Sequence, residues 1–132
     1  GRLPAGDDEV VRLAVALTDP VVRDRSMKLC LGETADAAER LWQALTRLTP
    51  APEVAEPATL AAVSAYLRGD GALAGIALER AEEAWPGHNL STLLRFVLAQ
   101  GVPPSRLSEF LADAVRDAEL TLADDEPAQE PA

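Results

Sequence analysis

The sequence predicts an all-α protein of about seven antiparallel helices. Its 132 residues include 25 Ala and 20 Leu but only ten Val and one Ile, a composition that favours helices over strands. Apolar residues recur every three or four positions along most of the chain, as in a helix with one buried face. Pro, Gly and Asp interrupt these stretches and indicate where helices begin and end.

The first part of the chain predicts three helices. Acidic residues suit a helix N-terminus, and those at 7–9 start a helix that ends near residue 17. Asp19 caps the second helix, which ends near Gly32. Thr34 caps the third helix, whose apolar side is expected to face the core. That side consists of Ala38, Leu41, Trp42, Leu45 and Leu48.

A proline-rich connector at 49–57 leads to a predicted helical hairpin. The fourth helix is expected over residues 57–68, with one apolar face. Glycines on both sides of Asp70 predict a tight turn, and Asp70 itself is expected to cap the fifth helix, which ends at Pro86. The expected apolar face of the fourth helix is Leu60, Val63, Ser64 and Leu67.

Two further helices complete the predicted domain, which spans residues 1–122. The sixth lies within 89–100 and ends at Gly101, and the seventh opens at Ser105. Residues 123–132 are rich in acids and proline and are expected to form a flexible tail. The expected apolar faces are Leu90, Leu93, Leu94, Val97 and Leu98, followed by Leu107, Phe110, Leu111, Ala114 and Ala118. Trp42 and Trp85 are expected to anchor the core.

Residues 55–88 carry the strongest internal pattern in the chain. Small residues occur where two helices would cross, with a larger residue one turn later and a closing proline, at Ala62, Gly69, Ala74, Leu78, Ala81 and Pro86. This pattern resembles a tetratricopeptide hairpin. A weaker copy lies 36 residues earlier, at Ala38, Trp42, Leu45 and Pro50. Such hairpins bury their faces by stacking, which predicts a curved layer of helices with a groove.

The charge of the chain excludes some classes of partner. With 22 acidic and 12 basic residues the net charge is −10, and residues 51–132 hold fourteen of the acids. An acidic surface repels nucleic acid and anionic membranes, so neither is an expected partner. The longest uncharged stretches, such as 57–67, have about eleven residues, whereas a membrane-spanning helix needs about 20. No secretory signal is recognisable, and a cytoplasmic location is expected.

No catalytic, cofactor or metal site is predicted. His88 is the only histidine and Cys30 the only cysteine, whereas a zinc or iron site needs three or four ligands. Cys30 lies between two leucines and is expected to be a buried apolar residue. A stand-alone enzyme would need a pocket that converges on one of these two residues. We therefore expect no enzymatic activity.

The segment from Tyr66 to Ala81 also carries a resemblance to a known family. Its most specific part is the block Arg-Gly-Asp-Gly-Ala-Leu-Ala at 68–74, which is similar to an actinobacterial family named domain of unknown function 4192. The resemblance covers roughly residues 8–104. It implies a helical, C-terminal portion of a longer bacterial protein with an α/β part upstream, and it implies no activity or catalytic residues.

These observations favour a non-enzymatic module that binds a protein segment, or docks on an upstream domain, through a groove beside the fourth and fifth helices. The residues expected to contact such a partner are Tyr66, Arg68, Asp70, Trp85 and His88. The alternative is an accessory or oligomerisation domain of an enzyme whose active site lies upstream, with self-association as one form of it.

Overall fold

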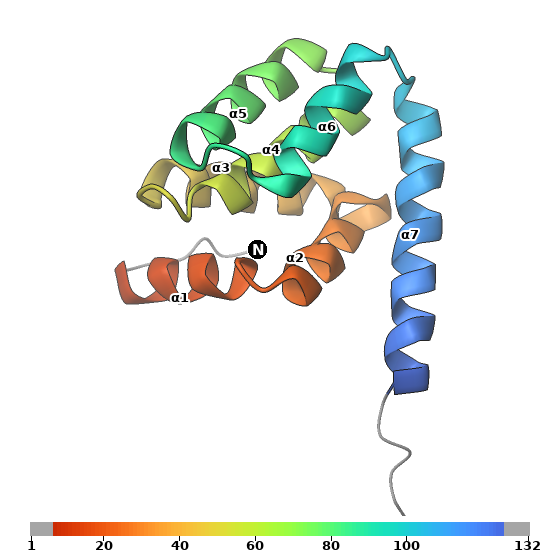
Figure 1. The fold of residues 1–132 in the computed structure, drawn as a ribbon, viewed down its shortest axis with the longest axis horizontal. Coiled ribbons are helices and arrows are strands. Elements are labelled where there is room, and N and C mark those ends of the chain that lie inside the picture. The colour runs from red at the N-terminus through yellow and green to blue at the C-terminus, as the bar shows by residue number, and fades with distance from the viewer. Residues whose placement is uncertain (1–6, 126–132) are drawn as a thin grey trace, which may run out of the picture.

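The computed structural model describes residues 7–125, which form seven α-helices, two short 3-10 helices and no strand. Both the all-α class and the number of helices are confirmed. The tetratricopeptide-like packing stays a prediction. Figure 1 shows the helices joined by short turns. Their bounds are α1 (Asp7–Leu17), α2 (Pro20–Met27), α3 (Ala35–Leu48), α4 (Ala55–Leu67), α5 (Gly71–Ala84), α6 (Asn89–Ala99) and α7 (Pro104–Asp125), with 3-10 helices at Lys28–Cys30 and Gly32–Thr34.

Helix α4 forms the centre of the fold. It packs most extensively on α5 and α3 and also contacts α1, α2, α6 and α7. All side chains from Ala55 to Ala65 are buried, so the prediction of a single apolar face was wrong. The helix consists mainly of Ala, Ser, Thr and small aliphatic residues, which allow neighbours to approach on every side. Its charged residue, Glu56, is therefore buried as well.

The turn between α4 and α5 forms as the sequence predicts. Gly69 adopts φ +90°, a conformation that side chains other than glycine rarely adopt, and so reverses the chain. The Asp70 carboxylate then accepts a hydrogen bond from the Leu73 N–H at 3.0 Å and caps α5. The hairpin thus brings the start of α4 next to the end of α5.

The second helix is shorter than predicted. Asp19 caps it as expected, accepting from the Val21 N–H at 2.9 Å, but α2 already ends at Met27 and gives way to 3-10 turns. Thr34 stands just before α3, yet its side chain makes no cap. Its hydroxyl donates instead to the carbonyl of Leu29 at 2.8 Å, so this expected cap was wrong.

One core cluster unites most of the helices. Trp42 is buried in it, as predicted, whereas Trp85 follows the end of α5 and is 38% exposed, so its predicted core role was wrong. Leu48, in the last turn of α3, is exposed as well and was also wrongly placed in the core. The large core residues from separate helices include Leu17, Met27, Leu45, Leu60, Leu78, Leu94, Leu107 and Leu111.

Helix α7 packs on the rest of the molecule along part of its length. It runs down one side of the bundle and continues beyond it (Figure 1). Leu107 and Leu111 are buried, but Phe110 and Ala114 of the same predicted face are exposed, so only half of that face was placed correctly. The helix extends to Asp125, which makes the first three residues of the predicted tail helical. Residues 126–132 of that tail, like Ala118 as a side chain, lie outside the described part of the structure.

Candidate functional site

An apolar groove of about 350 Å³ lies between α2, α6 and α7. Figure 1 shows α6 and α7 diverging from their shared turn. Helices α6 and α7 each line the groove with positions i, i+3, i+4 and i+7, which are two turns of one helix face. These residues are Leu90, Leu93, Leu94 and Val97 of α6, and Leu107, Phe110, Leu111 and Ala114 of α7.

Two large apolar side chains that line this groove, and a third on the neighbouring surface of α6, are open to solvent. Phe110 and Leu93, which line it, are 62% and 52% exposed, and Phe96, one turn from Leu93 on α6, is 63% exposed. The chain contains two phenylalanines, Phe96 and Phe110, and both are exposed. Burial of such a side chain contributes roughly 1–2 kcal/mol when half of its surface is covered. Clustered exposed apolar residues of this kind are typical of an interaction surface.

The charged residues that line the groove are Arg23 and Asp24, both on α2. The Asp24 side chain is 45% exposed. Glu109, Asp113 and Asp117 follow one another at intervals of four residues along the exposed side of α7, outside the lining of the groove. Arg116 partly offsets their charge, since it lies 3.4 Å from Asp113.

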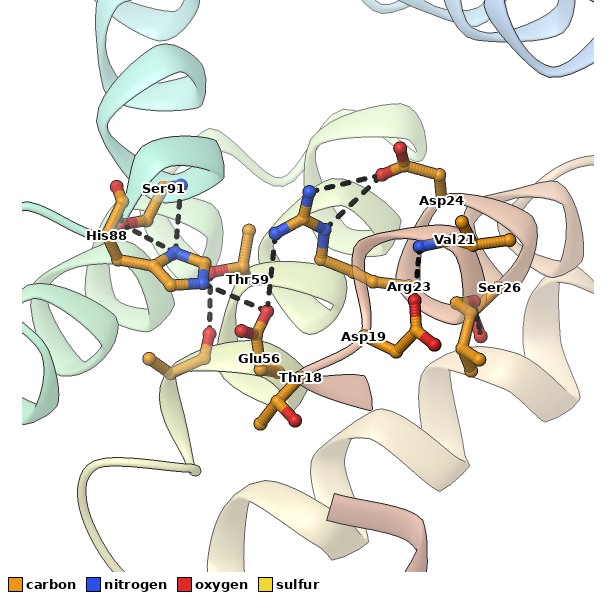
Figure 2. Close-up of polar contacts among 12 residues, drawn as sticks. Thr18, Asp19, Val21, Arg23, Asp24, Ser26, Glu56, Thr59, His88 and Ser91 are labelled. Carbon is orange, nitrogen blue, oxygen red and sulfur yellow. Dashed lines mark hydrogen bonds and ion pairs between the residues drawn. The ribbon is translucent and has the colours of Figure 1, made fainter. Parts of the chain in front are cut away.

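A buried polar cluster lies next to the groove. Glu56 and His88 are each more than nine-tenths buried, and Glu56 Oε1 lies 2.9 Å from His88 Nε2. The same oxygen lies 3.7 Å from a terminal nitrogen of Arg23, whose side chain is 16% exposed and lines the groove. Figure 2 shows the Arg23 guanidinium between the carboxylates of Glu56 and Asp24.

The hydrogen bonds of His88 fix which of its nitrogens carries the proton. The Ser91 N–H donates to His88 Nδ1 at 3.3 Å and thereby caps α6, so Nδ1 is unprotonated. The single ring proton therefore sits on Nε2, which faces Glu56. The contact is close but not aligned as a hydrogen bond, and both Glu56 Oε1 and His88 Nε2 lack a well-directed partner.

Arg23 is shared between two carboxylates. Its Nε and one terminal nitrogen each lie 3.3 Å from Asp24 Oδ1, and its other terminal nitrogen faces Glu56. The contacts with Asp24 are hydrogen bonds, whereas the contact with the buried Glu56 is a longer ion pair of 3.7 Å. The polar end of the groove, formed by Arg23, Asp24 and Asn89, thus has two carboxylates near one cation.

The five predicted partner-binding residues fall into two groups at opposite ends of the α4–α5 hairpin. Since α4 has 13 residues, its ends lie about 20 Å apart. Trp85 and His88 lie at one end, where their rings meet edge to face at 5.3 Å. Tyr66, Arg68 and Asp70 lie at the other. A single small ligand could not contact all five, and their role in binding stays a prediction.

The three residues at the far end of the hairpin have partners within the chain. The Tyr66 hydroxyl donates to the Val102 carbonyl. Arg68 donates to Glu39 at 2.8 Å and lies 3.5 Å from Asp70. The hydrogen bond with Glu39, together with the charge of that carboxylate, raises the pKa of Arg68 above its ordinary value. These contacts hold the turn together.

A shallower slot of about 250 Å³ lies beside α3, α4 and α5, at the place where the sequence predicts a groove. Ile76, Leu73 and Ala61 contribute its apolar surface, and Arg47 and Arg80 lie at its edge. The exposed Ile76 is the large apolar residue here, whereas the α2–α6–α7 groove has several. The charged residues of the slot, Arg47 and Arg80, are both basic.

Cys30 lines a third, more polar pocket of about 220 Å³ that also contains the Glu39–Arg68 pair. Its thiol is buried and lies 3.4 Å from the Ser64 hydroxyl. Burial raises the pKa of the Cys30 thiol, and a neutral thiol is a weak nucleophile. The arrangement fits an apolar core residue better than a reactive one.

The residues that the sequence did not indicate are Arg23, Glu56 and Phe96. Phe96 lies off the predicted apolar face of its helix, which is a signal that sequence alone contains. Glu56 directly precedes the eleven-residue uncharged stretch and could also have been noticed. Nothing local distinguishes Arg23 from other arginines, because its role depends on the packing of α2 against α4.

Among residues 7–125, no helix is long and apolar enough to cross a bilayer. The described residues likewise contain no group of three His, Cys, Asp or Glu side chains placed to hold a metal ion.

Comparison with known proteins places the chain in a family. The family model described as Domain of unknown function (DUF4192) matches residues 1–105, which include α1 to α6 and the start of α7. No curated protein and no solved structure matches the chain. Because the matched residues make up well over half of its length, the chain belongs to the DUF4192 family.

Proposed function

We propose that this chain is a docking module whose α2–α6–α7 groove binds an amphipathic helix of a partner protein. The observation that carries the proposal is the exposure of Phe110 and Leu93 in the lining of an apolar groove. Soluble proteins keep few large apolar side chains together on the surface unless these contact something. The other pockets have smaller volumes and fewer large apolar residues.

The shape of the groove favours a helix as the occupant. Its two long walls are α6 and α7, which diverge from a common turn (Figure 1). Each of these helices lines the groove with two turns of apolar side chains. A third helix placed between them would continue the helix-on-helix packing of the fold. Recognition of this kind uses apolar anchors at positions i, i+3, i+4 and i+7 of the bound helix.

Charge complementarity favours a basic polar face on that helix. The chain has a net charge of −10, and the half-exposed carboxylate of Asp24 lines the groove. The negative net charge would speed association with a helix that carries Lys or Arg residues, and one of these could lie close to Asp24. An acidic helix of the same shape would be repelled.

A direct test uses two synthetic peptides of about 18 residues, roughly five helical turns. Both carry Leu at the same helical positions, but one has Lys and the other Glu on the polar face. Fluorescence anisotropy is expected to show saturable binding of the Leu/Lys peptide and much weaker binding of the Leu/Glu peptide. Equal binding of both peptides, or of neither, would contradict the proposal.

Matched variants locate the binding site. The double variant Leu93→Ser/Phe110→Ser is expected to weaken binding of the Leu/Lys peptide at least about tenfold, because it removes exposed anchors without touching the core. The control Ile76→Ser changes an equally exposed residue in the slot between α3 and α5 and should leave the affinity unchanged. An equal loss in both variants would show non-specific attraction.

A second copy of the chain is the competing occupant. Sedimentation velocity of the wild-type chain is expected to show a monomer. A dimer that the Leu93→Ser/Phe110→Ser variant dissociates would assign the groove to self-association and overturn the assignment to a partner helix.

A further inference from the structure

We infer that Asp24 selects a Lys or Arg side chain at one end of the docked helix, the end that lies next to the N-terminus of α6. This inference rests on the proposed function and adds the chemistry that would orient the occupant. The polar end of the groove consists of Arg23, Asp24 and Asn89. Which of these side chains can recognise a ligand depends on the buried cluster behind them (Figure 2).

The first step is that the charge of Arg23 is needed inside the molecule. Glu56 is 2% exposed and lies on a helix that is buried on all sides. His88 lies 2.9 Å from it through Nε2 and accepts the Ser91 N–H at Nδ1. The permanent positive charge that faces Glu56 is that of Arg23, whose own side chain is 16% exposed. Removing that charge would leave a buried carboxylate uncompensated, which is strongly unfavourable.

The second step is that Asp24 remains only partly neutralised. Within the described residues, the contacts of its carboxylate to Arg23 all use Oδ1, at 3.3 Å. The side chain is 45% exposed and lines the groove, so its second oxygen is available to a ligand. Two carboxylates thus face one guanidinium, and of the two only that of Asp24 is accessible from the groove.

The third step concerns the charge of the ligand group that this end of the groove would bind. A ligand carboxylate would place a third negative charge around Arg23 and would have to compete with Glu56 and Asp24 for it. A ligand ammonium or guanidinium would instead complete the pairing of Asp24 and become partly desolvated beside the apolar wall, where ion pairs are stronger than in water. The exposed Asn89 offers a side-chain carbonyl to the same donor.

The test is a double-mutant cycle on the Leu/Lys peptide. Replacing one Lys near an end of the peptide by Gln, position by position, should reveal one site where the wild-type chain loses about three- to fivefold in affinity. With Asp24→Asn this loss should disappear. The control Glu83→Gln removes the same charge from the exposed side of α5, away from the groove, and should preserve the loss.

A charge swap adds a gain-of-binding readout. Asp24→Lys is expected to prefer the peptide in which that single Lys is replaced by Glu. An unchanged Lys preference in Asp24→Asn, or no preference in the wild-type chain while Leu93→Ser/Phe110→Ser abolishes binding, would contradict this inference alone. Failure of every peptide to bind would contradict the proposed function and this inference with it. Circular dichroism checks that each variant is folded.

Discussion

Arg23 links the interior of the molecule to its surface. Its guanidinium faces the buried Glu56 on one side and the half-exposed Asp24 on the other, and its side chain lines the groove. The same residue therefore supports the fold and sets the charge of the candidate site. A role of this kind is invisible in the sequence, since it depends on α2 packing against α4.

Two variants separate the contribution of the Arg23 charge to the free energy of unfolding from the contribution of its packing. Arg23→Met should lower the free energy of unfolding by about 3 kcal/mol, because Glu56 would be left buried without a counter-charge. The double variant Arg23→Met/Glu56→Gln removes both charges and should recover more than half of that loss. Urea denaturation followed by circular dichroism measures both. Equal destabilisation of the single and double variants would show that the ion pair contributes little.

Cys30 gives a prediction about pH. Burial raises the pKa of its thiol, so the folded state favours the neutral form and gains stability that is fully present below the ordinary thiol pKa of 9.0. This contribution is lost as the pH rises through the raised pKa. We expect wild-type stability to fall between pH 8 and about pH 10 more steeply than that of Cys30→Ala, as urea denaturation at several pH values would show. Parallel curves would contradict the burial of the thiol.

At the scale of single helices, the ends were predicted better than the faces. Asp19 and Asp70 cap their helices, and Gly69 and Gly101 adopt the positive φ expected where a helix stops. These signals are local, because a cap involves atoms only two or three residues apart. The predicted cap at Thr34 does not form, because its hydroxyl donates to the carbonyls of Leu29 and Leu31.

The faces were harder, because periodicity shows that a face is apolar but not that a neighbour covers it. Phe110 and Leu111 belong to the same predicted face of α7, yet the first is 62% exposed and the second 5%. For α4 the difference is the opposite one. More of its surface is buried than the predicted face, because small residues let other helices pack on all its sides. The groove consists of the apolar surface that remained uncovered.

The one-sided packing of α7 yields a paired prediction. Leu111→Ala should reduce the free energy of unfolding by about 2–3 kcal/mol, because it leaves a cavity in the core. Phe110→Ala, one residue away, should change it by less than about 0.5 kcal/mol, because that side chain lies mostly in solvent. Thermal unfolding of the two variants side by side measures the difference. A large loss in Phe110→Ala would show that Phe110 belongs to the core.

At the scale of the whole molecule, the composition and the Pro, Gly and Asp residues between the apolar stretches were enough to predict an all-α chain of seven helices. The position of the groove was not predictable, because α2 is far from α6 and α7 in the sequence and meets them only through tertiary packing. The sequence pointed instead to the α4–α5 hairpin, where local repeats are visible. The structure has a slot there, but the larger apolar surface lies on the side of α6 and α7.

The acidic charge acquires a more specific meaning in the structure. As a property of the sequence, a net charge of −10 predicts repulsion of polyanionic partners. The structure places one half-exposed carboxylate, that of Asp24, in the lining of the apolar groove. A partner that joins apolar anchors to a basic face satisfies both features at once.

Nuclear magnetic resonance of the isotope-labelled chain, titrated with the Leu/Lys peptide, tests the docking proposal most directly. The largest changes in amide chemical shift should fall on α2, on α6 and on the first half of α7, while those of the slot around Ile76 stay small. Changes centred on α3 and α5, or spread evenly over the acidic surface, would contradict the assignment of the groove.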